Sequence, residues 1–258
     1  MPETLLAALF GLLIGSFLNV CIYRWPRDLS VVKPRSKCPA CEAPIAWYDN
    51  IPVASWLILG GHCRNCKATI HWRYPAVELL TAAAFAWFAN ENGIGFVTAK
   101  LCVFSAILIA LAFTDADTRI LPDELTVGGT LIGFVLSAAT PPHLGSFVQS
   151  LIGASVAFGT LWFAGWLFEK LRHKEGLGFG DVKMMALIGA FLGFEGALLT
   201  IIAGSILGAI VGLAYIRLTG KDPATYELPF GTFLAIAGFL VAVEGETVLS
   251  WYTRNFLQ

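Results

Sequence analysis

Charge is scarce in this sequence. Only 14 % of its 258 residues are charged, whereas soluble domains average about 25 %. Hydrophobic residues make up 57 % of the chain, and its mean hydropathy is +0.71. Such a composition excludes an ordinary soluble domain and predicts an all-α polytopic membrane protein.

The first apolar run lacks a basic segment in front of it. It reads MPETLLAALFGLLIGSFLNV, in which the only charged residue is Glu3. Secretory signal peptides carry positive charge before their apolar core. We therefore expect residues 1–23 to form the first transmembrane helix rather than a cleaved signal.

Nucleotide and calcium motifs are also missing. The glycine-rich stretch GLGFGDVK, Gly176–Lys183, does not match the phosphate-binding pattern G-x-x-x-x-G-K-[ST], nor G-x-G-x-x-G after a strand. The stretch DADTRI, residues 115–120, lacks the glycine and the third oxygen ligand of a calcium loop. Neither a nucleotide site nor a calcium site is expected from these stretches.

Apolar runs of membrane-spanning length are abundant. A span needs about 20 mostly apolar residues, and breaks rich in glycine, proline or charge separate the runs. They predict about eight transmembrane helices, at residues 4–23, 75–91, 96–114, 124–140, 147–168, 183–195, 197–216 and 231–250. The sixth of these runs is short for a full crossing.

Lysine and arginine set the expected orientation, because they concentrate in cytoplasmic loops. If the long loop after the first span is cytoplasmic, 15 of the 17 basic residues fall inside, and only Lys100 and Arg254 fall outside. Beyond that loop, the inside residues are Arg119, Lys170, Arg172, Lys174, Lys183, Arg217 and Lys221. We therefore expect both chain ends to face out and the long loop to face in.

Two C-x2-C pairs, CPAC and CRNC, lie in this long loop. Their cysteines are Cys38, Cys41, Cys63 and Cys66. The spacing is typical of a tetrahedral zinc site made of four thiolates. Two disulfides are the alternative, which a reducing compartment disfavours. Lys37, Arg64 and Lys67 would offset the negative charge of such a centre, and its complete ligand shell predicts a structural role for the zinc.

The segment IAWYDNIPVASWLILGG between the two pairs is apolar but too short to cross a bilayer. Its Trp47, Tyr48 and Trp56 favour a position in the membrane interface. A hydrophobic core under the zinc site would have the same composition, so both interpretations stay open. His62 and His71 are expected at the surface, because four thiolates already complete the zinc shell.

Two aspartates fall at the same face of the predicted membrane domain. Asp115 ends the third span and Asp181 precedes the sixth, both on the expected cytoplasmic side. Ionisable residues beside spans default to functional roles. Two close carboxyls share a proton, so that one acts as general base on water and the other as general acid. We therefore predict that Asp115 and Asp181 form the catalytic pair of an aspartic protease.

Other residues near this pair have secondary roles. On a helix, Asp117 faces away from Asp115, and we expect Asp123 to be the N-cap of the fourth span. For Glu78, a snorkelling or paired structural role is expected, with a catalytic role as the alternative. Small residues let another backbone approach closely. The residues expected to leave room for an extended substrate are Gly176, Gly178 and Gly180.

Several segments, in order along the chain, resemble the bacterial type IV prepilin peptidases, which belong to the GxGD class of intramembrane aspartic proteases. They are GSFLNVCIYRWP, the two C-x2-C pairs, NIPVASWLILGG, RYPAVELLTA, DADTRILPD and GLGFGDVK, from Gly15 to about Gly193. In this family the catalytic pair is the first aspartate of a D-x6-P segment and the aspartate of GxGD. The corresponding residues here are Asp115, followed by Pro122, and Asp181.

The resemblance implies two activities. The first is cleavage of the basic leader of prepilins or pseudopilins, after a glycine, on the cytoplasmic side of the bacterial inner membrane. The second is methylation of the new N-terminal residue with S-adenosylmethionine, and family members with both activities carry the zinc loop. The site of this donor is not visible, although the GSFLNV segment and the long loop are candidates. The implied partners are the prepilin substrate and the lipid bilayer, without nucleic acid.

The expected organisation has three parts. Residues 1–23 are the first transmembrane helix, residues 24–74 the cytoplasmic zinc-binding loop, and residues 75–258 the transmembrane aspartic protease core. A proton-coupled transporter is the alternative function, but it requires carboxylates near the midplane and an internal repeat, and we see neither. A zinc-stabilised assembly factor would leave the paired aspartates without a purpose.

Overall fold

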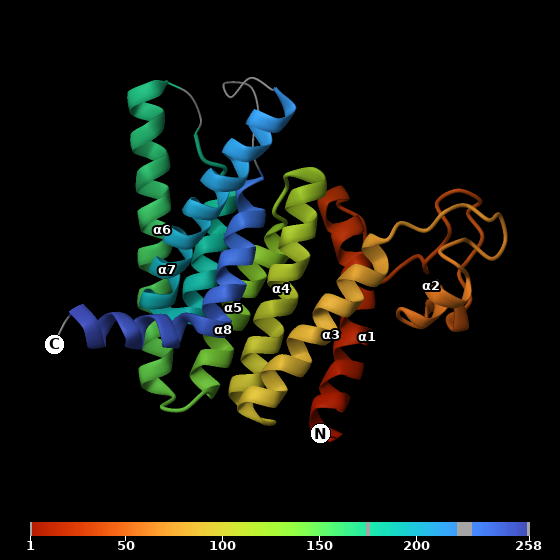
Figure 1. Ribbon diagram of the computed structural model, residues 1–258, viewed down its shortest axis with the longest axis horizontal. Helices are drawn as coiled ribbons and strands as arrows, with labels where there is room; N and C mark the ends of the chain where they lie inside the picture. Colours follow the sequence, from red (N-terminus) through yellow and green to blue (C-terminus); the bar gives the residue numbers. More distant parts are fainter. Residues whose placement is uncertain (1, 174–175, 221–228, 257–258) are drawn as a thin grey trace. The chain divides into compact units, whose positions relative to one another are not determined.

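The chain is helical throughout the part described by the computed structural model, which covers residues 2–173, 176–220 and 229–256. The helices are α1 (Pro2–Arg24), α2 (Ala54–Ile58), α3 (Arg73–Asn92), α4 (Phe96–Thr118), α5 (Asp123–Ala139), α6 (Leu144–Arg172), α7 (Phe179–Thr219) and α8 (Phe230–Phe256) (Figure 1). Two short 3-10 turns, Trp25–Arg27 and Trp47–Asn50, complete the regular structure. No strand occurs within these ranges, so the predicted all-α class is confirmed.

The chain divides into two compact units, residues 1–110 and 111–258, and the division falls inside α4. In the first unit, α1 packs against α3 through glycines. A Cβ atom on Gly11 would lie 2.7 Å from the Cα of Ala82, and one on Gly15 would lie 2.6 Å from the Cα of Glu78. The absence of side chains therefore lets the two backbones approach closely, as is common between membrane helices.

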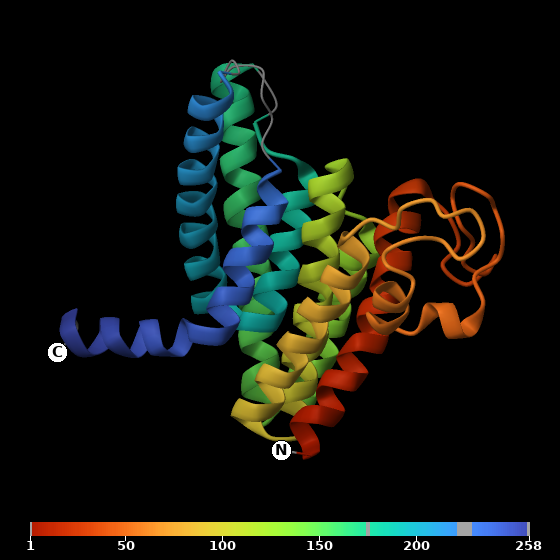
Figure 2. The same cartoon turned by 45° about the vertical axis from the view of Figure 1, so that its right-hand side comes forward.

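In the second unit, α7 is interrupted at Gly193, whose backbone is non-helical (φ 72°, ψ −171°). Both views show the parts of α7 before and after this residue running in opposite directions (Figures 1 and 2). This break lies at the end of the predicted sixth span. At a rise of about 1.5 Å per residue, the first part of α7 is about 21 Å long, less than the bilayer core.

The break also explains two buried serines. A helix that ends at Gly193 leaves its last carbonyl groups without partners within the helix. The hydroxyl of Ser137 on α5 and that of Ser150 on α6 both donate to the carbonyl of Ala190, at 3.1 Å and 2.5 Å. These two hydrogen bonds satisfy the carbonyl group of Ala190, to which lipid could not donate a hydrogen bond.

Five helices of the described residues are long and apolar enough to cross a membrane, namely α1, α4, α6, α7 and α8. The polytopic helical class is therefore confirmed. Helices α3 and α5 coincide with the predicted spans 75–91 and 124–140 but are not among the five. The count of eight spans stays a prediction.

In the second unit, the helix ends that carry Asp115 and Asp181 lie at the same end of the unit. The C-terminal ends of α4, α6 and α7 and the N-terminal ends of α5, α7 and α8 meet at one end of the unit (Figures 1 and 2). This arrangement agrees with the predicted alternation of spans. Of the basic residues expected inside, Lys174 and Lys221 lie outside the described residues.

Candidate active site

The structure brings Asp115 and Asp181 together. Asp115 lies in the last turn of α4 and Asp181 in the first turn of α7, with only 5 % and 9 % of each residue exposed. A Cβ atom placed on Gly231 would be 3.2 Å from the Cγ of Asp115 and 3.1 Å from Oδ1 of Asp181. Both carboxyls therefore lie beside one point, as a pair that shares a proton requires.

The first residues of α8 complete this site. The backbone N–H of Thr232 donates to Oδ2 of Asp115 at 2.7 Å, and its hydroxyl donates to the same oxygen at 2.9 Å. Sequence reasoning missed both Thr232 and Gly231. A signal was present, because GT begins an apolar run whose start is expected on the same side of the membrane as the two aspartates.

The predicted substrate glycines lie just before Asp181 or in the first turn of α7, and protein atoms surround them. A Cβ on Gly180 would be 3.1 Å from the Cβ of Leu121, and one on Gly178 would be 3.3 Å from Oδ2 of Asp181. A Cβ on Gly176 would overlap the ring of Phe168. A side chain at residue 178 would therefore crowd the carboxyl of Asp181, and the substrate-binding role of the three glycines stays a prediction.

The expected role of Asp123 was wrong. The N-cap of α5 is Pro122, and no side chain in the described part of the chain caps this end. The carboxylate of Asp123 instead forms an ion pair with Nζ of Lys183, which joins the N-terminal ends of α5 and α7. Asp117 is exposed, in agreement with its expected position away from Asp115.

In the first unit, the four cysteines of the long loop form a cluster. Their sulfur atoms all lie within 4.8 Å of one another, and all four thiols are free. The sulfurs of Cys38 and Cys66 are 3.8 Å apart. Two thiolates bound tetrahedrally to one zinc ion at about 2.3 Å would be separated by about that distance. The cluster can hold a metal ion, and its chemistry fits zinc.

Each of the two C-x2-C pairs folds into the same turn, which forms a knuckle: the first spans Cys38–Glu42 and the second Cys63–Lys67. The amide of Glu42 donates to the carbonyl of Cys38 at 2.9 Å, and the amide of Lys67 donates to that of Cys63 at 3.0 Å. Glu42 and Lys67 each follow the second cysteine of a pair and have positive φ angles of 58° and 60°. The repeated turn explains how two short segments present four sulfurs to one point.

The thiols of the cluster differ in acidity. Hydrogen bonds from the backbone N–H groups of Cys66 and Asn65 lower the pKa of Cys63 to about 7. At Cys66, the N–H of Ala68 favours the thiolate, but burial and the neighbouring thiols outweigh it and raise the pKa to about 11. Of these two thiols, Cys63 therefore becomes a metal-binding thiolate more readily than Cys66.

Two cations expected to offset the charge of the metal centre have other partners. Nε of Arg64 donates to both carboxylate oxygens of Asp49, at 3.0 Å and 2.8 Å, and Lys37 pairs with Glu42 at 3.2 Å. The hydrogen bonds from Arg64 lower the pKa of Asp49. The Arg64–Asp49 pair joins the segment between the knuckles to the second knuckle.

In the segment between the two knuckles, several large apolar side chains are exposed at the surface. Trp47, Leu57 and Ile58 are 74 %, 64 % and 79 % exposed. Trp56 instead faces its own loop, where its indole N–H donates to the carbonyl of Ile70 at 3.1 Å. The exposed apolar side chains favour the membrane-interface interpretation of this segment.

Glu78 has the paired structural role expected of it. It is 7 % exposed, and its Oε2 accepts a hydrogen bond from the N–H of Val53 at 2.7 Å. Val53 precedes α2 and has a positive φ of 57°, which is uncommon for a β-branched residue. Glu78 thereby ties the long loop to α3.

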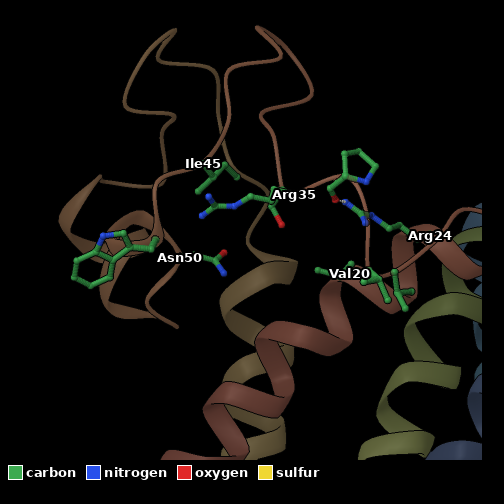
Figure 3. A pocket seen from close by; sticks show the side chains of 10 residues that line it. Val20, Arg24, Arg35, Ile45 and Asn50 are labelled. Atoms are coloured by element: carbon green, nitrogen blue, oxygen red, sulfur yellow. Dashed lines mark hydrogen bonds between the residues drawn. The ribbon is translucent and has the colours of Figure 1, made fainter.

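A cavity of about 300 Å³ lies between the end of α1 and the long loop (Figure 3). Val20, Ile45, Asn50 and two arginines, Arg24 and Arg35, line it. Its size and Arg35 suit the carboxylate end of S-adenosylmethionine, whereas both terminal nitrogens of Arg24 already donate to backbone carbonyls, those of Ser30 and Pro34. Among the described residues, no acidic side chain lines the cavity to face the ammonium and sulfonium groups of S-adenosylmethionine. The fit is therefore incomplete.

Comparisons with known proteins agree with these features. The model of the Bacterial Peptidase A24 N-terminal domain matches residues 9–91, and that of the Type IV leader peptidase family matches residues 102–213. Proteins named prepilin leader peptidase/N-methyltransferase from Aeromonas hydrophila and Pseudomonas aeruginosa are 38 % and 36 % identical to the chain. These alignments cover 98 % and 97 % of the chain, and 94 % and 92 % of the relatives.

A relative of the same name from Myxococcus xanthus is 42 % identical over 82 % of the chain and 62 % of its own length. No solved structure matches the chain. The N-terminal domain model precedes the peptidase model along the chain, and the alignments with the first two relatives cover nearly the whole chain. The chain therefore belongs to the type IV leader peptidase family.

Proposed function

We propose that this protein is an aspartic endopeptidase that removes the leader from type IV prepilins or pseudopilins. The observation that carries the proposal is the convergence of Asp115 and Asp181, two buried carboxyls from different helices, on one point. The proposed location is the bacterial inner membrane, with the site toward the cytoplasm. The inside bias of lysine and arginine supports this orientation.

The two carboxyls would hydrolyse the amide bond after the leader glycine. One takes a proton from water as the water oxygen attacks the carbonyl carbon, and the other gives a proton to the carbonyl oxygen; the carbon–nitrogen bond then breaks. Helix ends around the pair limit the access of bulk water. The side-chain-free position at Gly178 leaves the Asp181 carboxyl within reach of a substrate backbone, which supports a substrate-binding role for Gly176, Gly178 and Gly180.

The second proposed activity is methylation of the amino group exposed by cleavage. The names of the relatives support it, and S-adenosylmethionine would supply the methyl group. We further propose a structural zinc ion bound by the cysteine cluster, which would fix the loop of residues 24–74 beside the first helix, residues 1–23. Residues 75–258 would then form the protease core.

The test is incubation of the purified protein with a full-length prepilin and S-adenosylmethionine, followed by mass spectrometry of the product. The proposal expects a product that has lost its leader and gained the mass of one methyl group. Omission of the donor should leave cleavage intact and remove only the methyl group. An intact prepilin after prolonged incubation would contradict the proposed peptidase, and a cleaved but unmethylated product would contradict only the second activity.

A further inference from the structure

The aspartate pair is not symmetric. Oδ2 of Asp115 accepts two hydrogen bonds from Thr232, one from the backbone N–H at 2.7 Å and one from the hydroxyl at 2.9 Å. The hydroxyl has an alternative acceptor in the carbonyl of Ala112, at the longer distance of 3.2 Å. Asp181 interacts with one backbone amide, that of Gly178, and with no side-chain donor among the described residues.

Two donors directed at one carboxylate oxygen occupy its lone pairs. A proton cannot sit on an oxygen that already accepts both an N–H and an O–H bond without breaking one of them. The guanidinium of Arg119, one turn beyond Asp115 on the chain, also acts on Asp115 electrostatically. All three groups favour a negative charge on Asp115 over one on Asp181.

We infer that Thr232 is a positioning residue that assigns the roles in the pair, so that Asp115 is the general base and Asp181 carries the shared proton as the general acid. This inference rests on the proposed peptidase activity. Oδ1 of Asp115 is the oxygen left to face water, because Thr232 holds Oδ2. The α8 helix thus takes part in the site through its first turn, although it contributes neither carboxyl.

These roles account for every proton transferred during hydrolysis of the amide bond. Oδ1 of Asp115 takes one proton from water while the water oxygen bonds to the scissile carbonyl carbon, and Asp181 gives its proton to the carbonyl oxygen. The tetrahedral product then collapses: the carbon–nitrogen bond breaks, the proton on Asp115 passes to the leaving nitrogen, and one hydroxyl returns its proton to Asp181. One water molecule is consumed, and the pair regains its starting state.

The first experiment compares Thr232→Val with Thr232→Ser in steady-state cleavage of a prepilin. Valine keeps the shape and the backbone N–H but removes the hydroxyl, whereas serine keeps the hydroxyl. We expect kcat of the valine variant to fall about tenfold or more with KM nearly unchanged, because a hydrogen bond to a charged group is lost. The serine variant should stay within about twofold of the original protein.

Thr160→Val is the matched control, because the Thr160 hydroxyl is exposed and its hydrogen bond lies within its own helix, to the carbonyl of Val156 at 2.8 Å. It should leave kcat unchanged. Equal kcat for Thr232→Val and the original protein would overturn the positioning role. A failure of the serine variant to restore kcat would overturn it as well.

The second experiment uses the unaltered protein and reports the proton directly. An epoxide is opened by an ionised carboxylate, whose oxygen bonds to carbon while the ring oxygen takes a proton from water. A diazo ester instead takes the proton of a neutral carboxyl, loses nitrogen and esterifies that oxygen. After digestion and mass spectrometry, we expect the epoxide label on Asp115 and the diazo label on Asp181.

The reverse pattern, with epoxide on Asp181, would overturn the assignment while leaving the peptidase activity standing. Loss of the peptidase itself is a different result, since it would appear as uncleaved prepilin with the unaltered protein. The labelling does not depend on whether any Thr232 variant folds, so the role assignment stays testable in every case.

Discussion

At the scale of the residue, the geometry of Asp115 depends on a partner 117 positions away. Thr232 donates twice to its carboxylate, and Gly231 lies against the carboxyls of both Asp115 and Asp181. The sequence predicted the pairing of the two aspartates because each lies at the end of a predicted span, at the same face of the membrane. It could not show Thr232, since that contact arises from the packing of α8 against the end of α4.

Gly231→Ala is a residue-scale prediction. The new methyl group would lie 3.0 Å from Leu121, 3.1 Å from Asp181 and 3.2 Å from Asp115. It would therefore occupy space between the carboxyls and displace the water that must reach them. We expect leader cleavage to fall at least about a hundredfold, as when a catalytic group is misplaced by about 1 Å, measured as initial rate on a prepilin. Gly159→Ala, where the added carbon meets no atom within 4 Å, should cleave normally.

At the scale of the element, Gly193 converts one apolar stretch into two helices that run in opposite directions. The predicted break between spans 183–195 and 197–216 was close to this residue. The sequence alone did not reveal that the carbonyl of Ala190, just before the break, is held by Ser137 and Ser150. Those contacts come from two other helices, and only the folded unit brings them together.

Gly193→Ala tests this element. A residue other than glycine at φ 72° and ψ −171° carries backbone strain of about 1–3 kcal/mol. We expect the apparent melting temperature of the detergent-solubilised protein to fall, as followed by circular dichroism. Gly220→Ala is a poor control because Gly220 also has positive φ, so Gly159→Ala serves again. An unchanged melting temperature for Gly193→Ala would argue against the reversal at this residue.

The cysteine loop is the second element with its own prediction. Cys38→Ser and Cys63→Ser each remove one sulfur from the cluster, so bound zinc measured by elemental analysis should fall from about one ion per chain to near zero. Methylation of a pre-cleaved peptide should decline in these variants. Cys102→Ser is the control, because Cys102 is buried in α4 outside the cluster. Full zinc content in either knuckle variant would contradict the four-cysteine site.

At the scale of the whole molecule, composition was sufficient to predict a membrane protein. The placement of charge was sufficient to predict that the two aspartates lie at the same face of the membrane. The ordered motifs were sufficient for the family. Smaller features depended on packing that no motif encodes, such as the ion pair between Asp123 and Lys183 in place of an N-cap. Contacts within one segment can be predicted from the local sequence, whereas contacts between different helices can be identified only once the fold is known.

The most direct test of the account is the rate of leader cleavage by Asp115→Asn and Asp181→Asn, each purified and compared with Asp117→Asn on the same prepilin. Asparagine keeps the size of the side chain but cannot exchange the proton. We expect both active-site variants to release no leader, and the exposed Asp117 variant to cleave at the original rate. All three should still methylate a pre-cleaved peptide, which shows that they are folded. Substantial leader release by either Asp115→Asn or Asp181→Asn would contradict the aspartate pair.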